Sequence, residues 1–217
     1  NQILGELPEV IKPKTSNKLG GQRGFALTMV RSALKEIGFS DTDIQTGGLR
    51  VQTTLTPQAM KAVEDGINAV KPQGKPDLHA AAASVDVKTG RLLGFYAGQD
   101  YLKSQLNWAL LGGQPGSTFK PFALAAGLTD GFSLKDTFAG NSPLVLEDGQ
   151  RIKNEGSGNG TSYGSKVSLL KATEDSINTA FVDLTQSMAD DGPQKVVDMA
   201  VDLGIPRKSP GLGPNIG

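Results

Sequence analysis

A serine and a lysine three residues apart, Ser117 and Lys120, stand in the stretch GQPGSTFKPF. On a helix, side chains at positions i and i+3 lie on one face, a turn apart, so the lysine amine can reach the serine hydroxyl. Desolvation lowers the pKa of such a lysine, and the neutral amine can then accept the serine proton. Ser117 would also lie at the helix N-terminus, whose partial positive charge favours an alkoxide. The spacing therefore predicts a serine nucleophile activated by a lysine base.

The Ser-x-x-Lys spacing is not specific by itself, because it occurs three times in the sequence. Ser32 with Lys35, and Ser168 with Lys171, repeat it inside predicted helices that lack a glycine-rich lead and a following proline. For these two pairs, an exposed helix face is the default interpretation. The glycines before Ser117 leave room for a substrate to approach the backbone.

A second polar pair, Ser176 and Asn178, lies downstream in the string SIN. A second hydroxyl can relay a proton to a leaving amine, and a carboxamide can hold a peptide group through both its donor and its acceptor. Ser157 and Asn159 in the string SGN are a rival pair, but a glycine-rich loop would hold their geometry poorly. We therefore favour Ser176 and Asn178.

The composition excludes several other kinds of chemistry. The 217 residues include no cysteine and one histidine, His79, so disulfides and thiol catalysis are excluded and no metal site is expected. We interpret His79 as a histidine at a strand edge. The 22 basic and 22 acidic residues balance, so the basic excess of a nucleic-acid-binding protein is missing. No cofactor is predicted.

Neither a transmembrane helix nor a signal peptide is expected, because the sequence has no apolar run of about 18 residues and no charged start before an apolar stretch. The sequence begins at Asn1 and stops after GLGPNIG, so both ends look like cuts in a longer protein.

The elements that must position these residues follow from hydrophobic spacing and turn residues. Thr56 suits an N-cap with Pro57 in the first helical turn, and Pro121 requires its helix to begin close to Ser117. Short strands followed by clustered helices predict an α+β domain. Helices are expected at residues 23–37, 56–70, 117–128, 165–189 and 193–204, and strands at residues 47–55, 79–87, 91–97 and 142–149.

The motifs together resemble one family. GQPGSTFKPF followed by SINTAF is similar to the transpeptidase domain of class A penicillin-binding proteins. GGLRVQTTLTPQAMKAVEDGI, AAAASVDVKTGRLLGFYAG and NEGSGNGTSYGSKVSLLKATEDSINTAFVDL resemble further stretches of that domain in the family's order, over residues 24–205. The resemblance implies a central antiparallel sheet packed between helices. It divides the chain into an N-terminal connector at 1–46, with a helix near 23–37, and the N-terminal part of the transpeptidase domain at 47–217.

The family resemblance also implies an activity, a D,D-transpeptidase that cross-links peptidoglycan stem peptides through a serine acyl-enzyme and is acylated by β-lactams. Ser117 would be the nucleophile and Lys120 its base. Ser176 would pass a proton to the departing D-alanine, Asn178 would hold the substrate backbone, and the N–H of Ser117 would supply half the oxyanion hole. A β-lactamase, or a non-catalytic penicilloyl sensor or assembly domain, stays as an alternative. A β-lactamase would need another general base, and nothing aims Glu174 at a deacylating water.

Such enzymes have three short sequence motifs, or boxes. The first two correspond here to Ser117-x-x-Lys120 and Ser176-x-Asn178, and the third, Lys-Thr-Gly, lies on a strand that lines the cleft. Lys88-Thr89-Gly90 spells this box, but it lies between two predicted strands, where Gly90 suits a hairpin turn. The family order places the box after SIN, and the 39 residues that follow Asn178 contain neither Lys-Thr-Gly nor Lys-Ser-Gly. We therefore expect the third box and the C-terminal strands of the sheet to be missing from this chain.

The resemblance implies partners and a location as well. The partners would be stem peptides ending in D-Ala-D-Ala, β-lactams, and a second chain or fragment that supplies the missing C-terminal part, but no nucleic acid. The parent protein would lie outside the cytoplasm in the bacterial cell envelope, anchored in the inner membrane by segments absent here.

Overall fold

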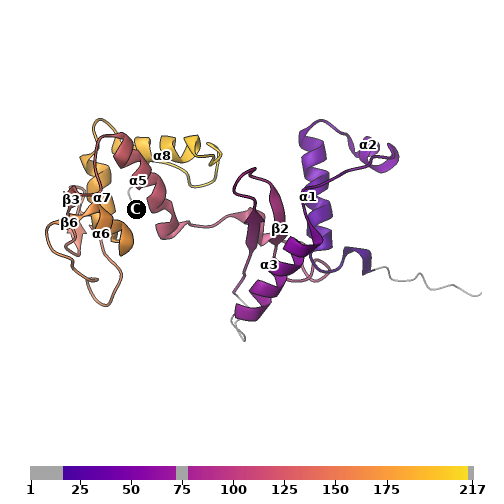
Figure 1. The fold of residues 1–217 in the computed structure, drawn as a ribbon, viewed down its shortest axis with the longest axis horizontal. Coiled ribbons are helices and arrows are strands. Elements are labelled where there is room, and N and C mark those ends of the chain that lie inside the picture. Colours follow the sequence, from indigo (N-terminus) through magenta and orange to yellow (C-terminus); the bar gives the residue numbers. More distant parts are fainter. Residues whose placement is uncertain (1–16, 72–77, 215–217) are drawn as a thin grey trace, which may run out of the picture. The chain divides into compact units, whose positions relative to one another are not determined.

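A computed structural model describes residues 17–71 and 78–214 of the chain (Figure 1). The chain divides into two compact units, Asn1–Gly112 and Gly113–Gly217. Both combine helices with short antiparallel strand pairs, which confirms the predicted α+β class. Among the described residues, no helix is both long and apolar enough to cross a membrane.

The first unit packs helices against one β-hairpin. Its elements are the 3-10 helix η1 (Asn17–Leu19), the helices α1 (Arg23–Glu36), α2 (Asp41–Thr46), α3 (Pro57–Val70) and α4 (Trp108–Leu111), and the strands β1 (Ala82–Val85) and β2 (Leu92–Tyr96). Phe25, Phe95 and Ala97 form its buried core. Thr56 caps α3 as predicted, because its hydroxyl accepts the N–H of Ala59 at 3.1 Å. The imidazole of His79 stacks on the Trp108 ring, with 3.8 Å between the ring centroids.

The strand predicted at residues 47–55 is wrong, because none of these residues lies in a strand. The Thr54 hydroxyl donates to the Leu92 carbonyl at 2.6 Å, and the Thr56 N–H donates to the Leu93 carbonyl at 2.9 Å. A side chain thus replaces one of the backbone donors that a strand ladder needs, and the segment runs beside β2 without joining its sheet.

The tripeptide Lys88-Thr89-Gly90 is the turn between β1 and β2, as predicted. Gly90 has φ +68, a conformation that glycine adopts without steric cost. The Asp86 carboxylate accepts the N–H groups of Lys88 and Thr89 and the Thr89 hydroxyl, at 2.8 to 3.0 Å. These bonds stabilise the turn, so the residues that spell the third box have a structural role here.

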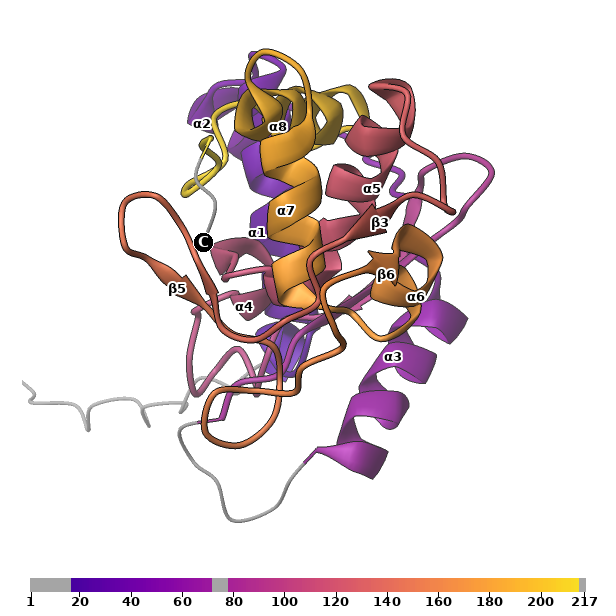
Figure 2. The ribbon, with the colours of Figure 1, turned by 90° about the vertical axis from the view of Figure 1, so that its left-hand side faces the viewer.

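The second unit contains Ser117, Lys120, Ser176 and Asn178. Its helices α5 (Lys120–Thr129), α7 (Asn178–Ser187) and α8 (Gly192–Asp202) contact one another in pairs (Figure 2). Leu169, Ile177 and Leu184 are the largest fully buried aliphatic side chains of the core beneath them. The remaining elements are η2 (Gly116–Phe119), α6 (Leu169–Glu174), and the strand pairs β3 (Thr137–Phe138) with β6 (Val167–Ser168) and β4 (Leu144–Val145) with β5 (Arg151–Ile152).

The single helix predicted over residues 165–189 is wrong. The segment instead forms β6, then α6, then α7, and the chain changes direction at residues 175–177 between the two helices. Apolar residues continue at helical spacing through the break, because both helices bury a face in the same core. The helical periodicity therefore gives no sign of the break between α6 and α7, which positions Ser176 and Asn178 of the candidate site.

Candidate active site

Ser117 and Lys120 meet across the junction between η2 and α5. Ser117 lies in the one-turn helix η2, and α5 begins at Lys120. Lys120 Nζ lies 3.0 Å from Ser117 Oγ, a hydrogen-bond distance. Pro121 occupies the first turn of α5, where the N–H that proline lacks would have no helical partner. Ser117 is exposed and Lys120 is partly buried, so the hydroxyl is open to a substrate while the amine is shielded.

Lys120 also contacts the second predicted pair of site residues. Its Nζ atom lies 2.6 Å from the Ser176 carbonyl oxygen, 2.9 Å from Ser176 Oγ and 2.6 Å from Asn178 Oδ1. The structure thus brings Ser117, Lys120, Ser176 and Asn178 together around one amine. The rival pair Ser157 and Asn159 lies in an exposed loop.

These four oxygens are compatible with a neutral lysine, although the two that can only accept also stabilise the ammonium. The Ser176 carbonyl and Asn178 Oδ1 can only accept hydrogen bonds, and they make the two shortest contacts with Nζ. A neutral amine has two N–H groups, which these two acceptors satisfy, and one lone pair. The Ser117 and Ser176 hydroxyls can donate as well as accept, so either can direct its O–H to that lone pair. Lys120 can therefore take a proton from Ser117 and return one through Ser176.

The surroundings of Lys120 favour the neutral form. Burial lowers the pKa of Lys120 below its ordinary value, because the low-dielectric site disfavours the ammonium, and the negative charge of Glu155 partly opposes this shift. The Phe181 ring centroid lies 5.6 Å from Nζ, a weak cation–π contact that, like Glu155, favours the ammonium. The geometry and the pKa direction both fit the predicted role of a base.

Ser176 holds its place through an unusual end to helix α6. The Ile177 N–H donates to the Ala172 carbonyl at 2.9 Å, and the Ser176 N–H donates to the Thr173 carbonyl at 3.3 Å. This bond pair is a Schellman motif, in which the residue after the C-cap is left-handed and is usually glycine. Here that residue is Ser176, with φ +55. Strained residues of this kind gather at functional sites, and this conformation turns both oxygens of Ser176 toward Lys120.

Ser176→Gly and Ser176→Ala are expected to separate the strain from the chemistry. Both remove the hydroxyl, so both should slow acylation of Ser117 by a penicillin. Glycine accepts the left-handed conformation, whereas alanine keeps its steric cost, so the glycine variant should be more stable by about 1 kcal/mol. Chemical denaturation of the two variants measures this difference. An alanine variant that is as stable as the glycine variant would contradict the strain.

Two residues of the site carried no signal in the sequence. The Asn178 Nδ2 group donates to the Lys153 carbonyl at 2.8 Å, and the side chain of the next residue, Asn154, accepts the Thr179 N–H at 3.0 Å. Lys153 takes part through its backbone, which any residue could supply. Asn154 lies between β5 and a glycine-rich loop, where an asparagine is common for turn formation alone.

The other Ser-x-x-Lys pairs have structural roles. Lys35, on α1 with Ser32, forms an ion pair with Asp41 at 2.9 Å. Ser168 is the N-cap of α6 and not an interior helix residue as predicted, because its hydroxyl accepts the Lys171 N–H. The Lys171 amine contacts the carboxylates of Glu174 and Asp175, which raise its pKa. Lys171 is therefore held in its charged form and is not suited to act as a base for Ser168.

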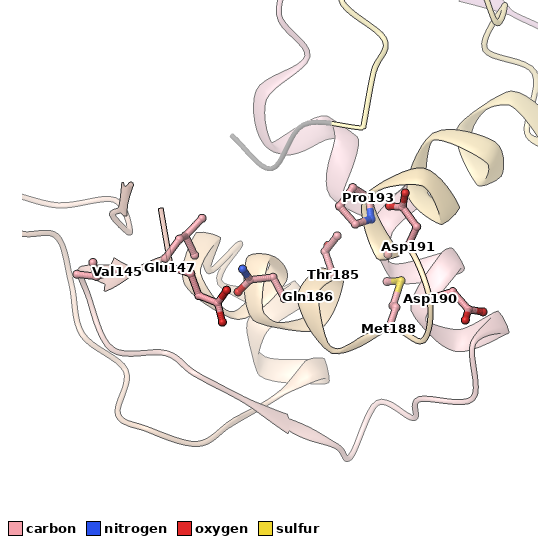
Figure 3. A pocket seen from close by; sticks show the side chains of 10 residues that line it. Val145, Glu147, Thr185, Gln186, Met188, Asp190, Asp191 and Pro193 are labelled. Atoms are coloured by element: carbon pink, nitrogen blue, oxygen red, sulfur yellow. The ribbon is translucent and has the colours of Figure 1, made fainter. Parts of the chain in front are cut away.

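A separate hollow of about 540 Å³ lies where the β4–β5 hairpin faces the turn between α7 and α8 (Figure 3). The residues that line it include the acidic residues Glu147, Asp190 and Asp191, and none of the four candidate site residues. In the parts of the chain that the structure describes, no three or more His, Cys, Asp or Glu side chains are placed so that together they could hold a metal ion. The contact between Ser117 and Lys120 places the candidate active site at the start of α5.

Residues 80–211 match the family described as Penicillin binding protein transpeptidase domain. The chain belongs to this family. The predicted resemblance is thereby confirmed, and the solved structure of the penicillin-binding protein PonA1 from Mycobacterium tuberculosis extends it to the fold. That structure superposes with a TM-score of 0.76 at 33% identity, covering 88% of this chain and 47% of the PonA1 chain.

Two curated relatives of this transpeptidase domain are named penicillin-binding protein 1A. The protein from Mycobacterium tuberculosis is 33% identical over 94% of this chain, and the one from Mycolicibacterium smegmatis is 31% identical over 90%. The chain spans 24% of the length of each. It therefore corresponds to one part of the proteins that it resembles.

Proposed function

We propose that this chain carries the nucleophile, the base and the proton relay of a D,D-transpeptidase that cross-links peptidoglycan stem peptides. The observation that carries the proposal is the position of Lys120 Nζ, within 3.0 Å of Ser117 Oγ and within 2.9 Å of Ser176 Oγ. A neutral lysine between two hydroxyls can move a proton from one to the other. Membership in the penicillin-binding protein transpeptidase family supports a serine acyl-enzyme.

The reaction begins when Lys120 accepts the Ser117 proton and Ser117 Oγ attacks the carbonyl carbon of the penultimate D-alanine. The N–H of Ser117 stabilises the oxyanion. Ser176 then gives its proton to the departing D-alanine amine and is reprotonated by Lys120, which leaves an ester on Ser117. An acceptor amine from a second stem peptide attacks this ester, forms the new peptide bond and returns a proton to Ser117. A β-lactam would acylate Ser117 by the same first step.

The β-lactamase alternative gains no support from Glu174, which lies two residues before Ser176. The Glu174 side chain is 68% exposed and contacts Lys171 at 3.3 Å, on the surface of α6. This contact occupies the carboxylate that a deacylating base would need. A long-lived acyl-enzyme, which an acceptor amine resolves, is therefore the better hypothesis.

Recognition of the terminal carboxylate of the substrate would come from residues outside this sequence. The Lys88-Thr89-Gly90 turn has another role, and the chain covers about half of the PonA1 chain. We propose that the family's third box lies in the remaining part, on the same protein or on a second fragment. We also propose that residues 1–46 are a connector and that the transpeptidase domain begins at residue 47. As in the family resemblance, the parent protein would act in the cell envelope.

A direct test uses the intact protein that contains this sequence, with a synthetic stem peptide ending in D-Ala-D-Ala and a D-amino acid as acceptor. The expected result is release of D-alanine together with a transpeptidated product. Hydrolysis of the terminal D-alanine without a transpeptidated product would indicate a carboxypeptidase. Rapid turnover of penicillin would favour the β-lactamase. No reaction with the peptide and no penicilloyl adduct would favour the non-catalytic alternative.

The pH dependence of acylation is expected to follow the ionisation of Lys120. Because the base must be neutral, the acylation rate should rise with pH on a limb that lies below the ordinary pKa of lysine. Glu155 raises the pKa of Lys120, so Glu155→Gln should lower it and move this limb to lower pH. Stopped-flow acylation by a chromogenic cephalosporin measures the limb. Glu147→Gln, which removes an exposed carboxylate from the β4–β5 hairpin, is the control and should leave it unchanged.

A further inference from the structure

Asn154 is one of four buried polar residues in the described parts of the chain, and its side chain is fully hydrogen-bonded. Its Nδ2 group donates to the carbonyls of Gly140 and Thr161, at 3.1 and 3.0 Å, and its Oδ1 accepts the Thr179 N–H at 3.0 Å. Its own N–H donates to Ser142 Oγ at 3.0 Å. The residue is 5% exposed and joins three segments that are distant in sequence.

These bonds act at the N-terminus of α7, where Asn178 begins the helix. The residue before Asn154 presents its carbonyl to Asn178 Nδ2, and Asn154 itself holds the N–H of the residue after Asn178. Two consecutive residues on one segment thus bind two consecutive residues on the other. The loop that follows is closed over Asn154, because the Thr161 N–H donates to the Glu155 carbonyl at 2.9 Å.

This double contact determines which end of the Asn178 amide meets Lys120. A carbonyl can accept a hydrogen bond but cannot donate one. The Lys153 carbonyl therefore holds the Nδ2 end of the Asn178 amide on its own side. The Oδ1 end then faces Lys120 Nζ at 2.6 Å. If residues 153 and 154 moved away, the amide could rotate and turn its N–H groups toward the amine.

We propose that Asn154 is a positioning residue for the acylation reaction, which holds residues 153–154 against α7 and thereby keeps Asn178 Oδ1 directed at Lys120. The inference rests on the proposed serine acyl-enzyme function. Asn154 touches neither the nucleophile nor the base, and none of its hydrogen bonds goes to a reacting atom. Its effect passes through the orientation of one amide.

The experiment is penicillin acylation of the intact protein, measured from low to high pH in wild type and in Asn154→Ala. Displacing a site residue by about 1 Å can cost about 10²-fold in rate, and a loss of that size is expected. The acid limb, which is the part of the pH profile where the rate rises as Lys120 loses its proton, should also move to lower pH. Asn178 Oδ1 stabilises the ammonium of Lys120, so losing it lowers the pKa of Lys120 and enlarges the neutral fraction. Glu155, the charged group on the loop side that acts on Lys120, remains in the variant.

A double-mutant cycle separates positioning from general damage. In an Asn178→Ala background the amide is already absent, so adding Asn154→Ala should shift the acid limb no further. Ser142→Ala is a milder variant in case Asn154→Ala does not fold. It removes the acceptor of the Asn154 N–H and should shift the limb in the same direction, with a rate loss of about tenfold.

Asp130→Asn is the matched control. It removes the charge that pairs with Lys195 and leaves one oxygen to accept the Ala189 N–H at the other end of α5, so it should lower the melting temperature and leave the acid limb in place. If the variants Asn154→Ala and Ser142→Ala are acylated at the wild-type rate and their acid limbs are not shifted, this inference alone is overturned. Absence of acylation in the wild type would overturn the proposed function and this inference with it.

Discussion

Ser117→Ala is expected to abolish covalent labelling of the intact protein by a fluorescent penicillin. Ser117 Oγ is exposed to substrate and lies 3.0 Å from the amine that would take its proton. Alanine leaves no atom that can form the ester. Removal of the catalytic serine of a serine protease costs on the order of 10⁶ in rate, so the label should fall below detection. Gel fluorescence, with intact-mass measurement of the penicilloyl adduct, provides the readout.

The chain contains its own controls for this substitution, since Ser32 and Ser168 stand in the same spacing before a lysine. Ser32→Ala should change neither the label nor the stability. Ser168→Ala removes the N-cap of α6 and should cost about 1 kcal/mol of stability, but the label should remain. A label that persists in Ser117→Ala, or one that disappears in Ser168→Ala while the fold is intact, would refute the assignment of the nucleophile.

The contact between Ser117 and Lys120 was predictable because it is local. Both residues lie in one helical turn, and a spacing of three brings their side chains together in α- and 3-10 helices alike. Pro121 fixed where that turn could begin. The antiparallel hairpin around Gly90 was predictable for a related reason, since a glycine at positive φ between two strand-like runs favours a turn.

The approach of Ser176 to Lys120 was not encoded in any local pattern. The break between α6 and α7 is usually marked by glycine in the left-handed position, but here the position holds serine. The apolar spacing runs through the break, so the periodicity predicts one long helix. SIN could be singled out by its residue types, whereas its geometry depends on a strained backbone that tertiary contacts maintain.

The support of Asn178 was hidden for a different reason. Its partner is the carbonyl of Lys153, and a backbone group leaves no trace in the sequence. Asn154 is recognisable only once Gly140, Thr161 and Thr179 are known to surround it. The candidate reacting residues can thus be inferred from side-chain chemistry, while the residues that hold them in place are identified only by long-range contacts.

Lys120→Arg is expected to reduce the rate of penicillin acylation by about 10³-fold, within the range that general acid–base catalysis contributes. The guanidinium keeps the positive charge and can still donate to the Ser176 carbonyl and Asn178 Oδ1, but it does not lose its proton in proteins and cannot be a base. Stopped-flow acylation measures the rate. Lys171→Arg, in the equally spaced pair on α6, is the control and should have no effect.

The pH profile of the Lys120→Arg variant distinguishes a base from a fixed charge. In the wild type, the rate should rise with pH as the partly buried amine of Lys120 loses its proton, below the ordinary lysine pKa. The variant has no titrating group in that position, so its residual rate should lose this limb. If Lys120 served only to stabilise the alkoxide with its charge, arginine would preserve most of the rate, and acylation would be fastest where the lysine is protonated. A rate that falls as pH rises through the pKa of Lys120 would therefore exclude the base, whereas a rising limb that disappears with Lys120→Arg would identify it.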